Sequence, residues 1–125
     1  MRRLKLVPAV SLGLSLAVNA AFGAELSYAE AEIIWYESKA KPEYQRYQAE
    51  FIQYSNYFHL DSQNSCYQIS NVRVHLFVII STKGVVEEVI SEIGGDKAAC
   101  FRQTYLGLRV KEPPFAPFVI SVNME

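Results

Sequence analysis

The sequence predicts a small α+β domain in which helices cover one face of a three-stranded antiparallel sheet, in the order α-α-β-β-α-β. Three patterns support this class. Aromatic residues recur every three or four positions after Pro42, as on one face of a helix. The segments 72–80, 85–93 and 118–124 are rich in β-branched and aromatic residues, as in strands. Gly94-Gly95-Asp96 separates the second of these segments from a further helical one.

The first 23 residues have the layout of a secretory signal peptide. Three basic residues within positions 2–5 precede an apolar stretch, and small residues flank a cleavage site after Gly23. The apolar stretch contains Pro8 and Asn19 and is short for a bilayer span. We therefore expect a cleaved leader without a stable membrane anchor, and a mature protein in the bacterial periplasm.

The composition fits one folded domain over 24–125. About one hundred residues remain after the leader, enough for a single hydrophobic core and too few for two. Half of the residues are apolar and 20% are charged, which excludes a disordered or low-complexity chain. Three of the 12 basic residues lie in the leader, while all 13 acidic residues remain. This acidic balance makes nucleic acid a poor partner.

Two helices are expected before the sheet. Ser27 and Glu30 have the spacing of a capping box, which predicts a helix from Ser27 to about Lys39. Pro42 suits the first turn of a second helix, whose aromatic stripe would pack on the sheet. The stripe consists of Tyr44, Tyr47, Phe51, Tyr54 and Phe58. The polar segment 59–65 that follows is predicted to be a loop.

A hairpin, a helix and a last strand complete the predicted fold. The segments 72–80 and 85–93 are joined by Ser81-Thr82-Lys83-Gly84, a turn in which Gly84 can take a positive φ. Asp96 is a suitable N-cap for a helix over 97–106. Phe118–Met124 alternates and forms the final strand. Two of the three strands must be edges, and an edge strand presents unpaired backbone groups.

Cys66 and Cys100 are the two cysteines of the chain. In an oxidising compartment an even pair most often forms one disulfide. Cys100 can face inward from its predicted helix toward Cys66 at the start of the sheet, so that the bond would join helix to sheet. Two free thiols or a redox site are the alternative, but the chain lacks the Cys-x-x-Cys spacing of redox sites.

The residues suggest no catalytic, cofactor-binding or metal-binding site. His59 and Asp61 could supply two metal ligands, but no third ligand is identifiable. His75 lies in the first strand, where a role in cross-strand packing explains it better than catalysis. Glu87 and Glu88 are neighbours in a strand, so their side chains would point to opposite faces and would not share a proton. We therefore expect a protein that is not an enzyme and needs no cofactor.

The order of motifs from Asn64 onward resembles the C-terminal periplasmic domain of the TolA family. These motifs are Asn64-Ser65-Cys66, Val72-Arg73-Val74, Thr82-Lys83-Gly84-Val85, Gly94-Gly95-Asp96-Lys97-Ala98-Ala99-Cys100 and Pro113-Pro114. The resemblance covers about 43–125, and Gly-Gly-Asp-x-Ala-x-Cys is its most specific part. The TonB C-terminal domain is more distantly similar and generally lacks the cysteine pair. Residues 24–41 would be an extra N-terminal helix before a core of 42–125.

The resemblance implies a non-catalytic adaptor of the cell envelope, connected with the Tol-Pal system. TolA domains bind envelope proteins such as TolB, and colicins and filamentous-phage coat proteins capture them, partly by strand addition at a sheet edge. The Cys66 and Cys100 pair matches the disulfide of the family. The expected partner-binding residues lie in the last strand and are Phe118, Val119, Ile120, Ser121 and Val122. Because TolA's membrane helix and Ala/Lys-rich stalk have no counterpart here, the expected role is stand-alone or accessory.

A periplasmic inhibitor or immunity-type protein is the alternative from a different class. The loop at 59–65 would then enter the cleft of an enzyme or a toxin. Substitutions in that loop, and not in the last strand, would abolish its activity.

Overall fold

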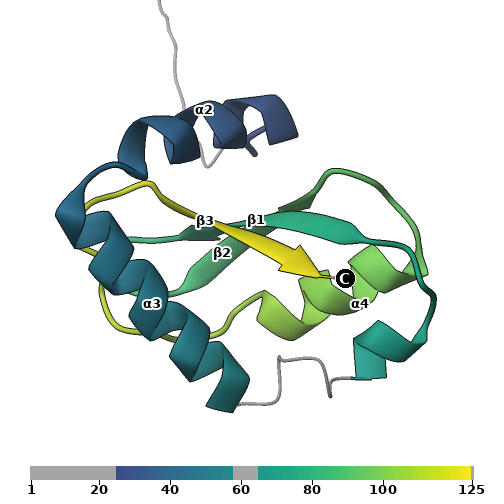
Figure 1. The fold of residues 1–125 in the computed structure, drawn as a ribbon. Helices are drawn as coiled ribbons and strands as arrows, with labels where there is room; N and C mark the ends of the chain where they lie inside the picture. Colours follow the sequence, from purple (N-terminus) through teal and green to yellow (C-terminus); the bar gives the residue numbers. More distant parts are fainter. Residues whose placement is uncertain (1–24, 58–64, 125) are drawn as a thin grey trace, which may run out of the picture.

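The computed structural model describes residues 25–57 and 65–124 (Figure 1). The elements are α2 (Tyr28–Ser38), α3 (Pro42–Tyr57), the 3-10 helix η2 (Ser65–Gln68), β1 (Val74–Ile80), β2 (Val86–Ser91), α4 (Asp96–Tyr105) and β3 (Phe118–Met124). The antiparallel sheet has the order β2-β1-β3. The predicted α+β class and element order are thus confirmed. The expected signal peptide and positions 59–64 of the expected loop lie outside the described residues.

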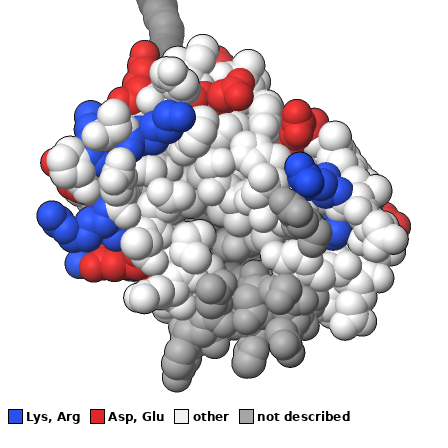
Figure 2. Space-filling view, in the orientation of Figure 1, with Lys and Arg blue, Asp and Glu red and all other residues white. Residues whose placement is uncertain are grey.

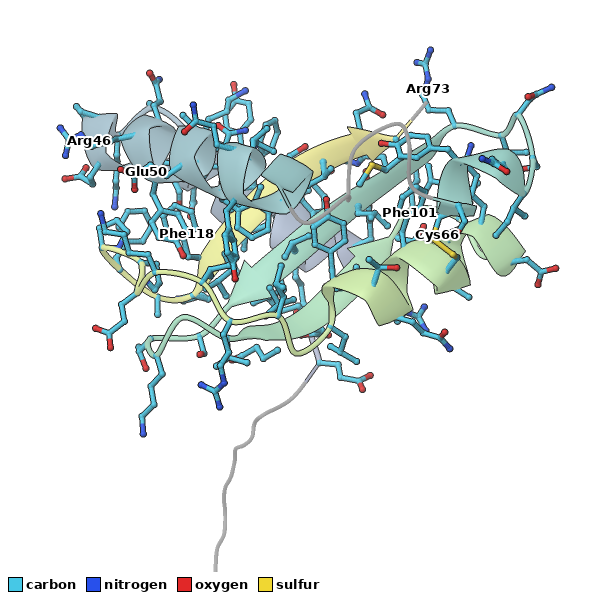
Figure 3. The ribbon with its side chains drawn as sticks, turned by 90° about the horizontal axis from the view of Figure 1, so that it is seen from below. Arg46, Glu50, Cys66, Arg73, Phe101 and Phe118 are labelled. Carbon is cyan, nitrogen blue, oxygen red and sulfur yellow. A yellow bond between two sulfur atoms is a disulfide. The ribbon has the colours of Figure 1, made fainter. Side chains whose placement is uncertain are left out.

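Helices cover both faces of the sheet, which corrects the expectation that they cover only one. On one face, α3 and α4 pack over Ile120 and Val122 of β3 (Figure 3). On the other face, α2 places Ala31 against Phe77 and Val119 (Figure 1). The cause is β1, in which every residue except His75 is buried. Successive strand residues point to opposite faces, so a strand that is apolar on both faces needs cover on both. The helix expected to be an extra therefore completes the core.

Local signals fix the helix starts. At α2 the Glu30 N–H donates to Ser27 Oγ (3.1 Å), and the Ser27 N–H donates to the Glu30 carboxylate (2.8 Å), so the capping box is confirmed. Pro42 is the first residue of α3, as predicted. At α4 the N-cap is Gly95, with φ 106°, and Asp96 lies in the first turn. A carboxylate in the first turn still favours the helix, because it faces the positive end of the helix dipole.

The aromatic stripe of α3 fills the space between that helix and the sheet. Tyr44 stacks on Phe118 with ring centroids 5.0 Å apart, and Tyr47 packs on the same ring at 4.6 Å. Phe51 meets Tyr105 of α4 at 6.1 Å. Figure 3 shows Phe118 between α3 and the sheet. The predicted stripe is therefore core along its first half, while Phe58 lies outside the described residues.

The hairpin between β1 and β2 is held by a later segment of the chain. Gly84 has φ +77°, and a Cβ there would lie 2.2 Å from the Val110 carbonyl oxygen, so only glycine fits. The Val110 N–H donates to the Gly84 carbonyl (2.7 Å). Val86 at the start of β2 exchanges two further backbone hydrogen bonds with Leu108 (2.9 Å) and Gly107 (2.8 Å). The segment 107–110 therefore closes the first part of the outer edge of β2.

Cys66 and Cys100 form the predicted disulfide, with their Cα atoms 5.6 Å apart. The bond joins η2, just before β1, to the middle of α4. Cys66 is 1% exposed, so the cross-link is also part of the core.

Removing this cross-link is expected to destabilise the domain. Replacing both Cys66 and Cys100 by Ala should lower the free energy of unfolding by about 3–4 kcal/mol, the chain-entropy value for a loop of this length. Urea unfolding with and without reductant measures the effect. Reductant should destabilise the wild type and leave the double variant unchanged. A double variant that unfolds at the same urea concentration as the wild type would contradict the prediction.

Candidate functional site

The strand expected to bind partners, β3, does lie at an edge of the sheet. Its side chains, however, belong to the core. Phe118, Val119 and Ile120 are 0% exposed, and Val122 is 7% exposed. Only Ser121 of the predicted set is partly exposed. A partner could reach the first half of this strand only if the covering helices moved.

Tyr44 closes the outer edge of β3. Its hydroxyl donates to the Val119 carbonyl oxygen (3.0 Å) and accepts hydrogen bonds from the Ser121 N–H and the Trp35 side chain. One hydroxyl thus meets a C=O and an N–H that would otherwise pair with a fourth strand. Burial raises the pKa of Tyr44 to about 12, so the phenol stays protonated and able to donate at physiological pH.

The outer edge of β2 is open over its second half. The Glu92 N–H donates to the His75 carbonyl (3.1 Å), and Val86 bonds outward to 107–108 before the β-bulge at Glu87. Backbone groups of successive strand residues point to alternate sides. Because Glu92 bonds to β1, the N–H and C=O groups of Ser91 and Val89 point away from β1. No residue in the described ranges donates to or accepts from these four outward groups. Ser91 is partly exposed, and Val89, although only 5% exposed, lines the groove described next.

A groove of about 370 Å³ follows this open edge. Residues 87–91 of β2 form its floor, and Glu25, Arg102 and Leu106 complete the lining. Val89 packs in the core on the α3 and α4 face, whereas Ile90 packs in the core on the α2 face. Because the groove is lined by both Val89 and Ile90, it runs along the edge of β2. It lies between the residues just before α2 and the C-terminal end of α4.

The groove carries more negative than positive charge. Among the described residues, Glu25, Glu87 and Glu88 line it together with a single basic residue, Arg102. Glu88 accepts the Leu26 N–H (3.1 Å), which ties the chain before α2 to β2. Burial raises the pKa of Glu88, the Leu26 hydrogen bond opposes this shift, and the charges of Glu25 and Glu87 add to it. By contrast, the face seen in Figure 2 has its charged side chains near the margins and few in the middle.

A second polar group of side chains lies where α2 begins. The Tyr28 hydroxyl is 2.5 Å from His75 Nδ1, and His75 Nε2 is 2.6 Å from Ser121 Oγ. A serine next to a histidine is also found in nucleophilic catalysis, where a third group, commonly a carboxylate, orients the histidine. Here the tyrosine hydroxyl takes that third position, and His75 packs edge-on against Phe77 with centroids 4.8 Å apart. This arrangement joins α2, β1 and β3, in line with the cross-strand packing role expected for His75.

Lys97 is a buried cation that the sequence analysis did not single out. Only 4% of it is exposed, and its ammonium group donates to the carbonyl oxygens of Ser70 (3.0 Å) and Val72 (2.7 Å). It therefore anchors the start of α4 to the segment that leads into β1.

The sequence does not reveal the open edge of β2 directly, although the adjacent carboxylates Glu87 and Glu88 are a signal for it. Charged residues within a strand are typical of an edge. The sequence could not show which of two edges would be covered, because that depends on where α3 crosses the sheet.

The described residues contain neither a metal-ligand cluster nor a membrane-spanning helix. Across 25–57 and 65–124, no three His, Cys, Asp or Glu side chains are grouped so that they could hold a metal ion. His59 and Asp61 lie outside those ranges. No helix within the same ranges is long and apolar enough to cross a bilayer.

Comparison with protein-family models, curated proteins and solved structures gave no match for this chain. The resemblance to the TolA family therefore stays a prediction from its motifs.

Removing the Tyr44 hydroxyl is expected to destabilise the protein more than removing that of Tyr47. Tyr44→Phe leaves the buried Val119 C=O and Ser121 N–H without their partner, at a cost of about 1–3 kcal/mol. Tyr47→Phe loses a single bond to the carbonyl of the exposed Lys111 and is the matched control. Urea unfolding, analysed with one m-value for both variants, compares their free energies of unfolding. If both variants lost the same free energy of unfolding, the Tyr44 hydrogen bonds at the β3 edge would stabilise the fold no more than the single Tyr47 bond does, which would contradict the prediction.

Replacing Glu88 by Gln is expected to stabilise the fold at neutral pH only. The raised pKa of Glu88 means that the folded state loses stability as pH rises through that pKa. Glu88→Gln removes this penalty and keeps an acceptor for Leu26. The gain should be roughly 0.5 kcal/mol or less at pH 7, since the side chain is only partly buried, and should vanish at pH 3.5. Urea unfolding at both pH values measures it, with Glu37→Gln, an exposed site outside the groove, as the control. A loss of stability at pH 7 would contradict the prediction.

Proposed function

We propose that this protein is an exported, non-catalytic interaction module that binds an extended segment of another envelope protein by strand addition. The observation that carries the proposal is the open edge of β2, where the outward N–H and C=O groups of Val89 and Ser91 face a groove. An extended segment that pairs there would extend the sheet to four strands and satisfy these groups.

The contrast between the two edges supports β2 as the docking strand. On the outer edge of β3, Tyr44 already bonds the Val119 C=O and the Ser121 N–H and also fills the core beneath them. Binding there would require the loss of buried aromatic contacts, whereas the outward groups of β2 lie along a groove and have no partner within the described residues. The proposed docking strand therefore differs from the last strand that the TolA resemblance implied.

The cellular setting of the proposal comes from the leader, the disulfide and the motif resemblance. A disulfide between Cys66 and Cys100 is compatible with an oxidising compartment such as the periplasm. The resemblance to TolA suggests three kinds of partner: a TolB-like protein, a colicin, or a filamentous-phage coat protein. Each of these would contribute an extended segment to the sheet.

Proline substitutions at the two edges test the proposal. The N–H of Ser91 points outward from β2, and by the same alternation the N–H of Asn123 points outward from β3. Ser91→Pro and Asn123→Pro each remove one outward donor and keep the bonds to β1. Ser91→Ala removes only the side chain and is the control for the local Ser91–Ile93 hydrogen bonds.

The expected result is that a partner crosslinked to the mature protein in the host envelope is lost from Ser91→Pro. The same partner should remain on Ser91→Ala and Asn123→Pro. Quantitative mass spectrometry measures recovery, and thermal unfolding confirms that each variant is folded. Loss on Asn123→Pro alone would move the site to β3. A partner recovered equally from all variants would refute strand addition.

A further inference from the structure

We propose that the segment bound at β2 is a strand in which lysine or arginine alternates with apolar residues. This inference rests on the strand-addition function proposed above and names the chemistry of the partner. It follows from the charges along the groove and from their distribution between the two faces of the sheet.

The carboxylates of the groove lie close enough together to act on one another. The charges of Glu25 and Glu87 raise the pKa of Glu88, so the three share one electrostatic environment. Arg102 is the one cation among the described residues that line the groove. Glu25 and Glu87 are exposed. An incoming strand with cationic side chains would reduce this repulsion, whereas an acidic strand would increase it.

The lining also differs between the two faces of the added strand. Glu88 and Ile90 point to the α2 side of the sheet, where the Leu26 backbone bonds to Glu88. On the other side lies Leu106, the C-cap residue of α4, which is 50% exposed. Side chains of a paired strand alternate in the same way and lie about 5 Å from their cross-strand neighbours. Cationic residues would therefore face the α2 side, and apolar residues would face Leu106.

The same features disfavour a second copy of this chain as the occupant. If two β2 edges paired around a two-fold axis, the carboxylates of one copy would face those of the other. Like charges across a strand pair are destabilising. The bulge at Glu87 and the glutamates are also devices that keep sheet edges from pairing with their own kind. The edge is thus selective, because it repels its own sequence and attracts a basic one.

Labelled peptides test the inference. The probes are an alternating Lys-Val octapeptide, an alternating Glu-Val octapeptide and a block peptide with the lysines of the first peptide grouped at one end. Fluorescence anisotropy gives the Kd of each for the mature protein. The alternating lysine peptide should bind at least about tenfold tighter than the other two. Size-exclusion chromatography should show a monomer without peptide.

Variants then separate the charge from the strand pairing. Glu25→Gln with Glu87→Gln should weaken the lysine peptide about fivefold, as expected for two exposed ion pairs. Glu37→Gln with Glu43→Gln, which makes the same change in net charge outside the groove, should have little effect. Glu88 is left intact in this experiment because it holds Leu26.

The outcomes distinguish the two proposals. If the glutamate peptide binds as tightly as the lysine peptide and Ser91→Pro abolishes both, strand addition stands and the basic partner is refuted. If the block peptide binds as tightly as the alternating one, and Ser91→Pro has no effect, the attraction is charge alone and strand addition at β2 is refuted as well. A dimer that dissociates on Ser91→Pro would identify a second copy as the occupant and refute the basic partner.

Discussion

The structure depends on a central strand that is apolar on both faces. Leu76, Val78 and Ile80 of β1 point into one layer, and Phe77 and Ile79 point into the other. No three-stranded sheet with such a strand can leave one face in water, so α3 and α4 cover one side and α2 covers the other. With both faces covered, only the two edges of the sheet remain to meet another molecule.

The two edges solve the problem of unpaired backbone groups by different means. At β3 a phenol from α3 takes the place of a neighbouring strand and gives the groups buried partners. At β2 the outward groups of Val89 and Ser91 have no partner within the described residues, and a bulge and glutamates lie beside them, features that are typical of protected sheet edges. The Tyr44 hydrogen bonds at β3 stabilise the fold, whereas the unpaired groups of β2 leave a place where another strand could pair. This difference between the edges is what supports β2, and not β3, as the docking strand in the proposal.

The sequence was sufficient for the class, the order of elements and the disulfide, because each rests on a local pattern. Period-two alternation in Phe118–Met124 and the capping box at Ser27 are examples. It was not sufficient for the layers, because the continuous apolar run in β1 does not say which helix covers Phe77. Nor could it show that Tyr44 bonds to Val119, 75 residues away, since that contact depends on how α3 crosses the sheet. The TolA resemblance implied binding at the edge of β3. The Tyr44 hydrogen bonds at that edge depend on the tertiary structure and could not be predicted from the motifs.

The contact between Gly84 and Val110 constrains how this protein can vary. Hairpin tips are usually where insertions, tags and sequence drift are tolerated. Here Thr82 and Lys83 are exposed, but Gly84 is buried, and a single methyl group at Gly84 would collide with the Val110 backbone. Homologues that lengthen this turn must also reroute 107–110, so the two segments should change together during evolution. An epitope tag or fluorescent insertion at this hairpin would have to leave Gly84 and its contact with Val110 unchanged.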